Sequence, residues 1–298
     1  MAARQNGCVH HAQLRAAGLH PMEIRRLREQ QGWGTILPGV YGDEKETGFE
    51  QGLHAALLWS GANSVVSHRA AARVLGLDGI DAAPTEITVP LSRRPRSKKV
   101  VVHRSELSRS DSQVHKRLRL TSAARTLVDL AGVVDEDTLS LAVESAWRRR
   151  LCSLEALEQR AFELGTQGRP GMKALSSVME DCRDRGKPLD SALEVRLWRT
   201  WPAELPRPVP GLQFRDDVAQ PGRIDFAFPE QLLAVECDGF ETHGLREVFE
   251  SDRVRLSRLA GLGWRVVHVT ARQLSDPEEV FRRISRALYW RPATGRWS

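Results

Sequence analysis

A strand, turn, strand, helix and strand pattern over residues 222–270 constrains this chain more than any other feature. Two short apolar runs, 223–228 and 232–239, lie on either side of a proline-containing turn. A helical repeat follows, two glycines end it, and residues 264–270 form another apolar run. We therefore expect a hairpin, a helix and a further buried strand, in that order.

Three carboxylates interrupt the two apolar runs. Glu236 and Asp238 share one face, because side chains alternate along a strand. Asp225 joins that face if Phe228 pairs with Gln231, whereas a register change of one residue sends it to the other face. Three converging carboxylates favour a divalent cation, and oxygen ligands suit magnesium, manganese or calcium rather than zinc. The alternative is strand-end carboxylates on the wet face of an antiparallel hairpin.

The helix that follows carries an acidic residue inside its apolar stripe. Asp252 stands where the 3.6-residue period predicts a core residue, and a buried aspartate needs a partner. Nearby cationic side chains are Arg253, Arg255, Arg258 and His243. An aspartate at the edge of the stripe, or a structural pair with Arg255, explains the pattern equally well.

These residues resemble the PD-(D/E)xK nuclease superfamily, most closely the branch related to very-short-patch-repair endonucleases. The resemblance covers about residues 188–290, and it implies a restriction-endonuclease-like mixed sheet flanked by helices. It also implies cleavage of phosphodiester bonds with Mg²⁺ or Mn²⁺. The positions that carry it are Asp225, Glu236-x-Asp238-Gly239, His243, Asp252-Arg253-x-Arg255 and Gly263-Trp264-Arg265-Val266.

The resemblance assigns roles to these positions. Asp225 and Glu236 would be metal ligands, and Asp238 would be a ligand or would position the attacking water. His243 would be the base. Arg253 or Arg255 would contact the phosphate or hold Asp252 in place. Two positions depart from the superfamily motif, which has Pro at position 224 and Lys at position 238. That lysine helps to activate the attacking water, so its absence leaves the general base open. The branch often lacks this lysine, and His243 is the candidate base in its place.

Ser191-x-x-Glu194 opens a predicted helix before the hairpin. Glu194 has a local explanation as the capping-box acid of this helix. It also matches the acidic residue that the nuclease family often carries on its first helix. Capping and metal contact compete for the same side chain.

The N-terminal residues 9–45 read as a helix-turn-helix followed by two strands. The second helix, over residues 21–31, carries Arg25, Arg26 and Arg28 on its wet side. A DNA recognition helix needs such guanidinium groups, although a solvated basic face is the alternative. The pattern, with Leu37-Pro38-Gly39-Val40-Tyr41, resembles the N-terminal winged helix of AbiEi-type antitoxins, which implies DNA binding.

The middle of the chain is mostly helical in pattern, with strands expected over 86–89 and 100–103. Residues 93–119 contain ten Lys or Arg and only two acids, which makes this segment a candidate for phosphate contacts. A solvated loop is the alternative. The residues expected to bind DNA here are Arg93, Arg94, Arg96, Lys98 and Lys99. Residues 64–71 and 120–130 also resemble the AbiEi-like architecture, and we interpret His68, Arg125 and Asp129 as capping or packing residues.

Composition supports these expectations. A net charge of +6 favours acidic partners such as nucleic acid. Four scattered cysteines without a C-x-x-C pair argue against a zinc knuckle or a disulfide framework and fit a reducing cytoplasm. No apolar run approaches the ~20 residues that span a membrane, and no signal peptide is evident, so we expect a cytoplasmic protein.

We therefore expect an α/β and α+β multidomain protein. Its parts are a winged helix-turn-helix at 1–45, a mostly helical domain with a small sheet at 46–183, and a nuclease domain at 184–298. The boundary between the last two lies at the charged stretch 183–188. The leading hypothesis is a metal-dependent DNA endonuclease, with a homodimer or a cognate toxin as further partners. The alternatives are a regulator or antitoxin whose nuclease domain has lost catalysis, and a nuclease for RNA or for damaged or branched DNA.

Overall fold

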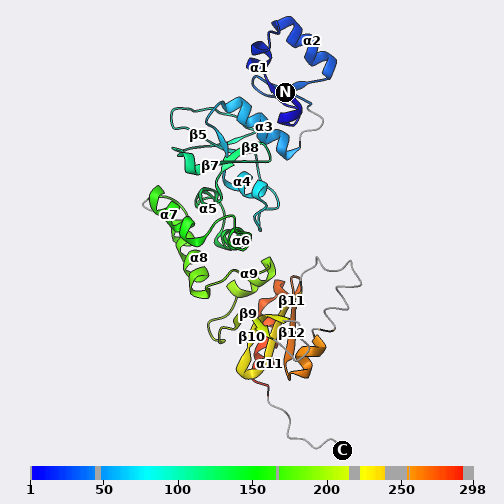
Figure 1. Ribbon diagram of the computed structural model, residues 1–298, viewed down its shortest axis with the longest axis vertical. Coiled ribbons are helices and arrows are strands. Elements are labelled where there is room, and N and C mark those ends of the chain that lie inside the picture. Colours follow the sequence, from blue (N-terminus) through cyan, green and yellow to red (C-terminus); the bar gives the residue numbers. More distant parts are fainter. Residues whose placement is uncertain are drawn as a thin grey trace, which may run out of the picture. The chain divides into compact units, whose positions relative to one another are not determined.

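The computed structural model describes residues 2–43, 48–165, 168–214, 222–238, 254 and 256–290. The chain is of mixed α/β type and forms two compact units, Met1–Arg183 and Asp184–Ser298 (Figure 1). The division falls at the charged stretch where the sequence indicates a boundary. In the described part of the chain, no helix has the length and apolar character needed to cross a membrane.

The first unit begins with two helices and a three-stranded antiparallel sheet of order β1-β3-β2. Its elements are η1 (Ala2–Gln5), β1 (Val9–His10), α1 (His11–Ala16), α2 (Pro21–Gln31), β2 (Gly34–Leu37) and β3 (Val40–Gly42). The first helix, expected from residue 9, starts at His11, because Val9 and His10 pair with β3 instead. Gly32 ends α2 in the left-handed conformation, with a φ of 64°.

A five-stranded sheet of order β6-β5-β4-β8-β7 follows. Its strands are β4 (Val65–Val66), β5 (Glu86–Val89), β6 (Val101–Arg104), β7 (Ser112–His115) and β8 (Leu118–Thr121), with a short turn, η2 (Arg109–Asp111), before β7. Sequence patterns predict β5 and β6 but not β4, β7 or β8. The β7–β8 hairpin lies inside the basic segment 93–119, so this segment is a folded hairpin at its end rather than one long loop.

Helix α3 (Phe49–Ser60) joins the N-terminal sheet to the five-stranded sheet. One buried cluster combines side chains from all three: Cys8, Ile36, Leu37, Val40, Ala55, Ala56, Ile87, Val89 and Val100. Residues 1–43 therefore share a core with α3 and β5. This shared core explains why the N-terminal part, expected as a domain of its own, lies within one compact unit that extends to Arg183.

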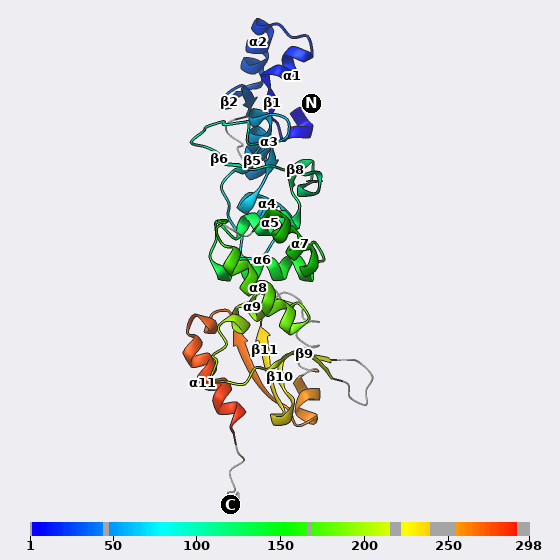
Figure 2. The same ribbon diagram turned by 90° about the vertical axis from the view of Figure 1, so that its left-hand side faces the viewer.

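A layer of helices completes the first unit (Figure 2). The helices are α4 (His68–Leu75), α5 (Ala123–Leu130), α6 (Glu136–Arg148), α7 (Leu154–Leu164) and α8 (Met172–Arg185). Their apolar faces form a large buried cluster with strand residues such as Val66, Leu118 and Leu120. This layer also contains buried charged side chains.

Arg125 of α5 is almost fully buried, with 1% of the residue exposed. Its Nε donates to Asp129 at 2.9 Å, and its Nη1 lies 3.3 Å from Asp111. The same guanidinium donates to the Ser105 hydroxyl and the Glu106 carbonyl at 2.9 and 3.2 Å. The chain between β6 and β7 is thereby fixed to α5.

The second unit contains a four-stranded sheet of order β12-β11-β10-β9 (Figure 2). Its elements are α9 (Ala192–Arg199), β9 (Val209–Phe214), β10 (Gly222–Phe228), η3 (Pro229–Gln231), β11 (Leu233–Asp238), β12 (Arg265–Thr270), η5 (Gln273–Ser275) and α11 (Pro277–Leu288). β9, β10 and β11 are antiparallel, and β12 runs parallel to β11. The sheet is therefore mixed.

Helices cover this sheet. Trp198 and Trp201, in α9 and just after it, contact the ring of Phe226, and Trp201 also contacts Phe281 of α11. Leu259, in the helical residues 256–261, packs with Ala227 and Ala234. The hairpin at the centre of the sheet is thus held by apolar contacts from α9, α11 and the helical residues 256–261.

Replacing Arg125 should strongly destabilise the first unit. Arg125→Met leaves the buried carboxylates of Asp111 and Asp129 without their shared cation, so the free energy of unfolding should fall by about 3–5 kcal/mol. Urea unfolding followed by circular dichroism measures this loss. Arg150→Met, which removes an exposed arginine, should change stability by less than about 0.5 kcal/mol. Equal losses in the two variants would contradict a central role for Arg125.

Candidate functional sites

In the second unit, the Arg223 guanidinium gathers three carboxylates. The side chain leaves β10 and lies 2.5 Å from Asp190, 2.8 Å from Glu194 and 3.6 Å from an oxygen of Asp225. These acids come from the segment before α9, from α9 itself and from β10. The cluster therefore links the first helix of the unit to the central hairpin.

Glu194 takes part both in the cap of α9 and in the ionic cluster around Arg223. Its backbone N–H donates to the Ser191 hydroxyl, and its carboxylate accepts from the Asp190 N–H, both at 3.1 Å, so it caps α9. The same carboxylate accepts from Arg223. Burial, followed by the nearby charge of Asp225, raises the pKa of Glu194.

The register of the β10–β11 hairpin differs from the expected one. Phe228 pairs with Leu233 rather than with Gln231, because η3 lengthens the turn and Leu232 takes a φ of 45°. The alternation of side chains along β10 is also interrupted. Ile224 and Ala227 belong to the same core cluster, although ideal alternation places residues three apart on opposite faces.

Asp225 lies at this interruption. Its carboxylate accepts the backbone N–H of Cys237 at 2.9 Å, so it is fixed against β11 next to Glu236. Burial is the largest cause that raises the pKa of the Cys237 thiol. The further causes are the negative charges of Asp225, Glu194, Glu236 and Asp238. The charges of four acids therefore act on Cys237, and Asp225 contacts its backbone directly.

Glu236 and Asp238 differ sharply in their surroundings. Glu236 is 1% exposed, at the centre of β11, whereas 47% of the Asp238 side chain is exposed. The Asp238 oxygens lie 3.0 and 3.2 Å from Nδ1 of His268 in β12. His268 is also the residue of β12 that pairs with Glu236 of β11 in the sheet.

His268 was missed by sequence reasoning. The signal was present, because His268 is an imidazole in the otherwise largely apolar run 264–270. Parallel pairing of β11 with β12 gives it a place beside both acids of the Glu-x-Asp motif. That pairing cannot be read from the run itself.

The donors around Cys237 fit a hard divalent cation, since carboxylate oxygens are the ligands that magnesium and manganese prefer. The buried Glu236 and the partly buried Asp225 are the residues that could hold it. Within the described residues, no group of three His, Cys, Asp or Glu side chains is arranged as a ready metal site. His243, Asp252, Arg253 and Arg255 lie outside the described residues.

In the first unit, the three expected arginines of α2 have different surroundings. Arg25 pairs with Glu29 at 3.0 Å on an exposed surface, and Arg26 is exposed. Arg28 lies over the ring of Tyr41 and donates to Thr35 of β2. Arg28 is therefore partly a packing residue, whereas Arg25 and Arg26 face solvent.

The basic residues of the loop after β5 also fall into two groups, those that contact the rest of the protein and those that are exposed. Arg93 donates to the Ser60 carbonyl, and Lys99 donates to the Ile36 carbonyl of β2 at 3.2 Å. These two contacts fix the ends of the loop. Arg94, Arg96 and Lys98 lie between them and are exposed. β2 thus contacts both α2 and the basic loop.

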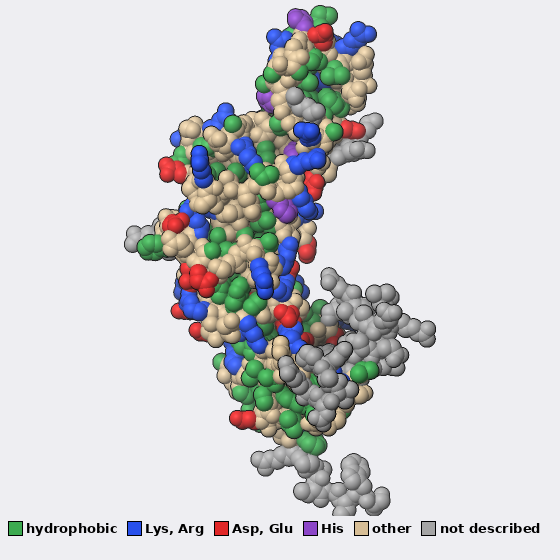
Figure 3. Space-filling model, viewed as in Figure 1, with side chains coloured by type: hydrophobic (Ala, Val, Ile, Leu, Met, Phe, Trp, Pro, Cys, Tyr) green, Lys and Arg blue, Asp and Glu red, His purple; other side chains and the backbone are tan. Residues whose placement is uncertain are grey.

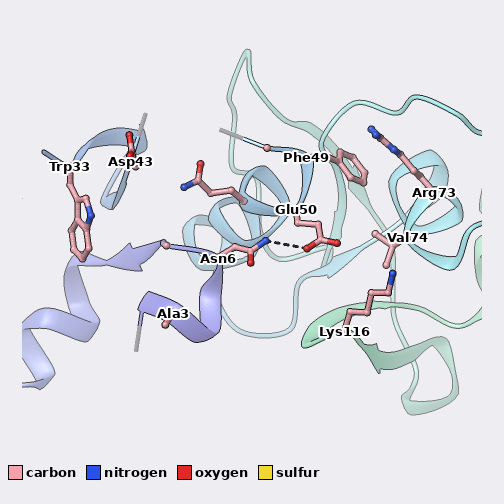
Figure 4. A pocket seen from close by; sticks show the side chains of 12 residues that line it. Ala3, Asn6, Trp33, Asp43, Phe49, Glu50, Arg73, Val74 and Lys116 are labelled. Carbon is pink, nitrogen blue, oxygen red and sulfur yellow. Dashed lines mark hydrogen bonds between the residues drawn. The ribbon is translucent and has the colours of Figure 1, made fainter. Parts of the chain in front are cut away.

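Basic side chains are spread over the visible face of the first unit (Figure 3). A hollow of 770 Å³ lies between the N-terminal segment and α3, and Figure 4 shows its lining. Asn6 donates to Glu50 at 3.2 Å, and the Arg73 guanidinium lies 4.1 Å from the centre of the Phe49 ring. These contacts satisfy polar groups of the hollow from within the protein.

A buried polar cluster surrounds the start of α4. The His68 ring stacks on His103 with 3.5 Å between ring centres, and its Nδ1 lies 2.9 Å from the Ser67 hydroxyl. His68 has a φ of 51°, so its backbone is strained. Glu86, fully buried, lies 2.8 Å from His103 and accepts from Arg69. Burial raises the pKa of Glu86, but hydrogen bonds from His103 and Arg69 lower it to about 2.

Comparison with known proteins identifies distant relatives. Two uncharacterized proteins of Mycobacterium tuberculosis, MT2308 of strain CDC 1551 / Oshkosh and Rv2248 of strain ATCC 25618 / H37Rv, are each 26% identical to this chain over 239 residues. The similarity covers 79% of this chain and 85% of each relative. No family model matches the chain.

His68 should make the first unit sensitive to acid. Burial, followed by the charge of His103, lowers the pKa of His68 from 6.5 to about 3, so below pH 6.5 the unfolded chain binds a proton that the folded chain excludes. Stability should therefore fall as pH drops from 6.5, by up to about 1.4 kcal/mol per pH unit. In His68→Asn, which tolerates the same backbone conformation, that contribution should vanish.

Urea unfolding at pH 7.5, 6.0 and 5.0 measures this difference between wild type and His68→Asn. The control is His115→Gln, which removes an imidazole at the end of β7. A wild-type pH slope that survives in His68→Asn would show that other groups cause the acid sensitivity.

Proposed function

We propose that this protein is a magnesium- or manganese-dependent DNA endonuclease, with a nuclease-like second unit and a DNA-binding first unit. The observation that carries the proposal is the pairing of Glu194 and Asp225 with Arg223, beside the strand that carries the buried Glu236. It supports the resemblance of this unit to PD-(D/E)xK nucleases, whose motif carboxylates match Asp225 and Glu236. The mixed sheet with a parallel β11–β12 pair is compatible with that fold.

The chain's own residues have distinct tasks in this proposal. Glu236 and Asp225 offer carboxylate oxygens, and the Cys237 N–H fixes the orientation of Asp225. Arg223 holds Asp225 and Glu194 together and offsets part of their repulsion. A bound divalent ion supplies an activated water and neutralises charge on the scissile phosphate.

The DNA-binding part of the proposal rests on exposed cations in the first unit. Arg25 and Arg26 extend from α2, and Arg94, Arg96 and Lys98 extend from a loop whose ends are fixed. Cations on a folded scaffold bind phosphates at a smaller entropy cost than cations on a free chain. The two helices and the β2–β3 hairpin support a winged helix-turn-helix here.

A second candidate function is a DNA-binding regulator whose nuclease-like unit no longer cuts. One observation favours it. Asp238 replaces the motif lysine and is engaged by His268, so this position offers no cation to the attacking water. Binding of DNA without cleavage in any divalent metal would select this function.

The first test of the proposal is cleavage. Purified protein should nick or cut DNA with Mg²⁺ or Mn²⁺ and not with EDTA. Asp225→Asn and Glu236→Gln, which keep side-chain size but remove a ligand charge, should each reduce the rate at least about 100-fold. Gel assays on supercoiled, linear, branched and single-stranded DNA measure the rates.

Glu230→Gln is the matched control for these variants. It removes an exposed carboxylate from η3, in the same hairpin, and should cut like wild type. Normal cutting by Asp225→Asn or Glu236→Gln would disprove the assignment of the centre. Absence of cutting by wild type on every substrate would favour the regulator.

A second test measures DNA binding in EDTA, so that cleavage does not interfere. Replacing Arg94, Arg96 and Lys98 with Gln should reduce the slope of log affinity against log salt by roughly 2–3, because each phosphate contact contributes about 0.9. Fluorescence anisotropy with a labelled duplex gives the slope.

The control for this experiment removes three exposed cations elsewhere, Arg150, Lys173 and Arg286, and should leave the slope within error. An equal reduction in both triple variants would indicate a general charge effect. An unchanged slope in the loop variant would show that the loop does not contact DNA.

A further inference from the structure

A second hollow in the first unit has a basic lining. Its volume is 380 Å³, and it lies between the N-terminal segment, the second half of α3 and the β7–β8 hairpin. The cationic and imidazole side chains in its wall are Arg4, His10, His54, Arg117 and Arg119. No acidic side chain is among the described residues that line it.

The wall of this hollow is held in place by hydrogen bonds. Gln5 and Gln13 exchange two side-chain hydrogen bonds, at 3.1 and 2.8 Å, and Gln13 also accepts from the backbone of His10. These contacts fix η1 against α1. The floor is formed by α3, which belongs to the shared core through Ala55 and Ala56. The hollow is therefore preformed.

The arginines of the hollow are available for an anion. Arg4 and Arg117 are exposed and Arg119 is half-buried. Burial, with a smaller contribution from His11, lowers the pKa of His10, and burial lowers the pKa of His54. Both imidazoles are therefore neutral near pH 7 and can each donate one N–H.

The turn of the β7–β8 hairpin, which carries Arg117 at the wall of the hollow, has a strained backbone. His115 pairs with Leu118, so Lys116 and Arg117 are the two turn residues, and their φ angles are 48° and 66°. Two-residue turns of this kind favour Asn-Gly, because L side chains with positive φ cost about 1–2 kcal/mol each. Two long cations at these positions conflict with local preference, and such conflicts cluster at functional sites.

We propose that this hollow binds a phosphate of the DNA backbone, with Arg117 and Arg119 as the principal contacts and Arg4 closing the site. Paired guanidinium groups hold phosphate oxygens through fork-like hydrogen bonds, and neutral imidazole N–H groups complete the donor set. The site rests on the DNA-binding part of the proposed function. It adds to that function a preformed contact at a fixed place, formed by residues other than those of α2 and of the stretch 94–98.

The test compares the full-length protein with the double variant Arg117→Asn, Arg119→Gln in EDTA. Asparagine tolerates the positive φ at position 117. Fluorescence anisotropy over a range of salt concentrations should show that the salt slope falls by roughly 1, because one phosphate contact is lost, and that affinity falls equally for duplexes of unrelated sequence. Melting temperatures of the variant and wild type verify that the fold is intact.

The charge-matched control is the double variant Arg150→Gln, Lys173→Gln, whose positions are exposed and line no part of the hollow. Wild-type slope in the control and a reduced slope in the hollow variant would support the site. An unchanged slope in the hollow variant, with wild type binding DNA, overturns the site and leaves the proposed function standing. Equal reductions in both variants also overturn it. A wild type that binds no DNA overturns the DNA-binding part of the proposed function itself.

Discussion

Charge withdrawn from water must meet opposite charge, and this requirement organises both units. In the first unit the Arg125 guanidinium is almost fully buried and draws Asp111 and Asp129 to it. Arg160 of α7 then pairs with the other oxygen of Asp111 at 2.6 Å. One ionic cluster therefore joins three separate segments, and moving any of them breaks at least one ion pair.

The second unit uses the same principle for a different purpose. Arg223 neutralises part of the negative charge of a set of acids that includes Glu194 and Asp225. This cluster lies at the edge of the apolar core. Burial is the largest cause of the raised pKa of Glu194, and the charge of Asp225 adds to it. The positive charge of Arg223 acts in the opposite direction and offsets part of this effect.

Local signals made some elements predictable. Pro21 and Gly32 bound α2, and Ser191 caps α9, as their sequence patterns indicate. Non-local features were not predictable. The hairpin register depends on the positive φ of Leu232, and the surroundings of Asp225 depend on a break in alternation beside it. The β7–β8 hairpin lacks an Asn-Gly turn and lies in a segment rich in Lys and Arg, so its sequence resembles a solvated loop.

The parallel pairing of β11 with β12 has a consequence for how the chain folds. Glu236 and His268 are neighbours in the sheet although about thirty residues separate them in sequence. The β10–β11 hairpin needs only local contacts and can form within microseconds, whereas the parallel pair waits for a long crossover to close. During synthesis, β11 therefore presents an unpaired edge until β12 has left the ribosome. Such an edge invites pairing with another nascent copy, so chains truncated before β12 should be prone to aggregation.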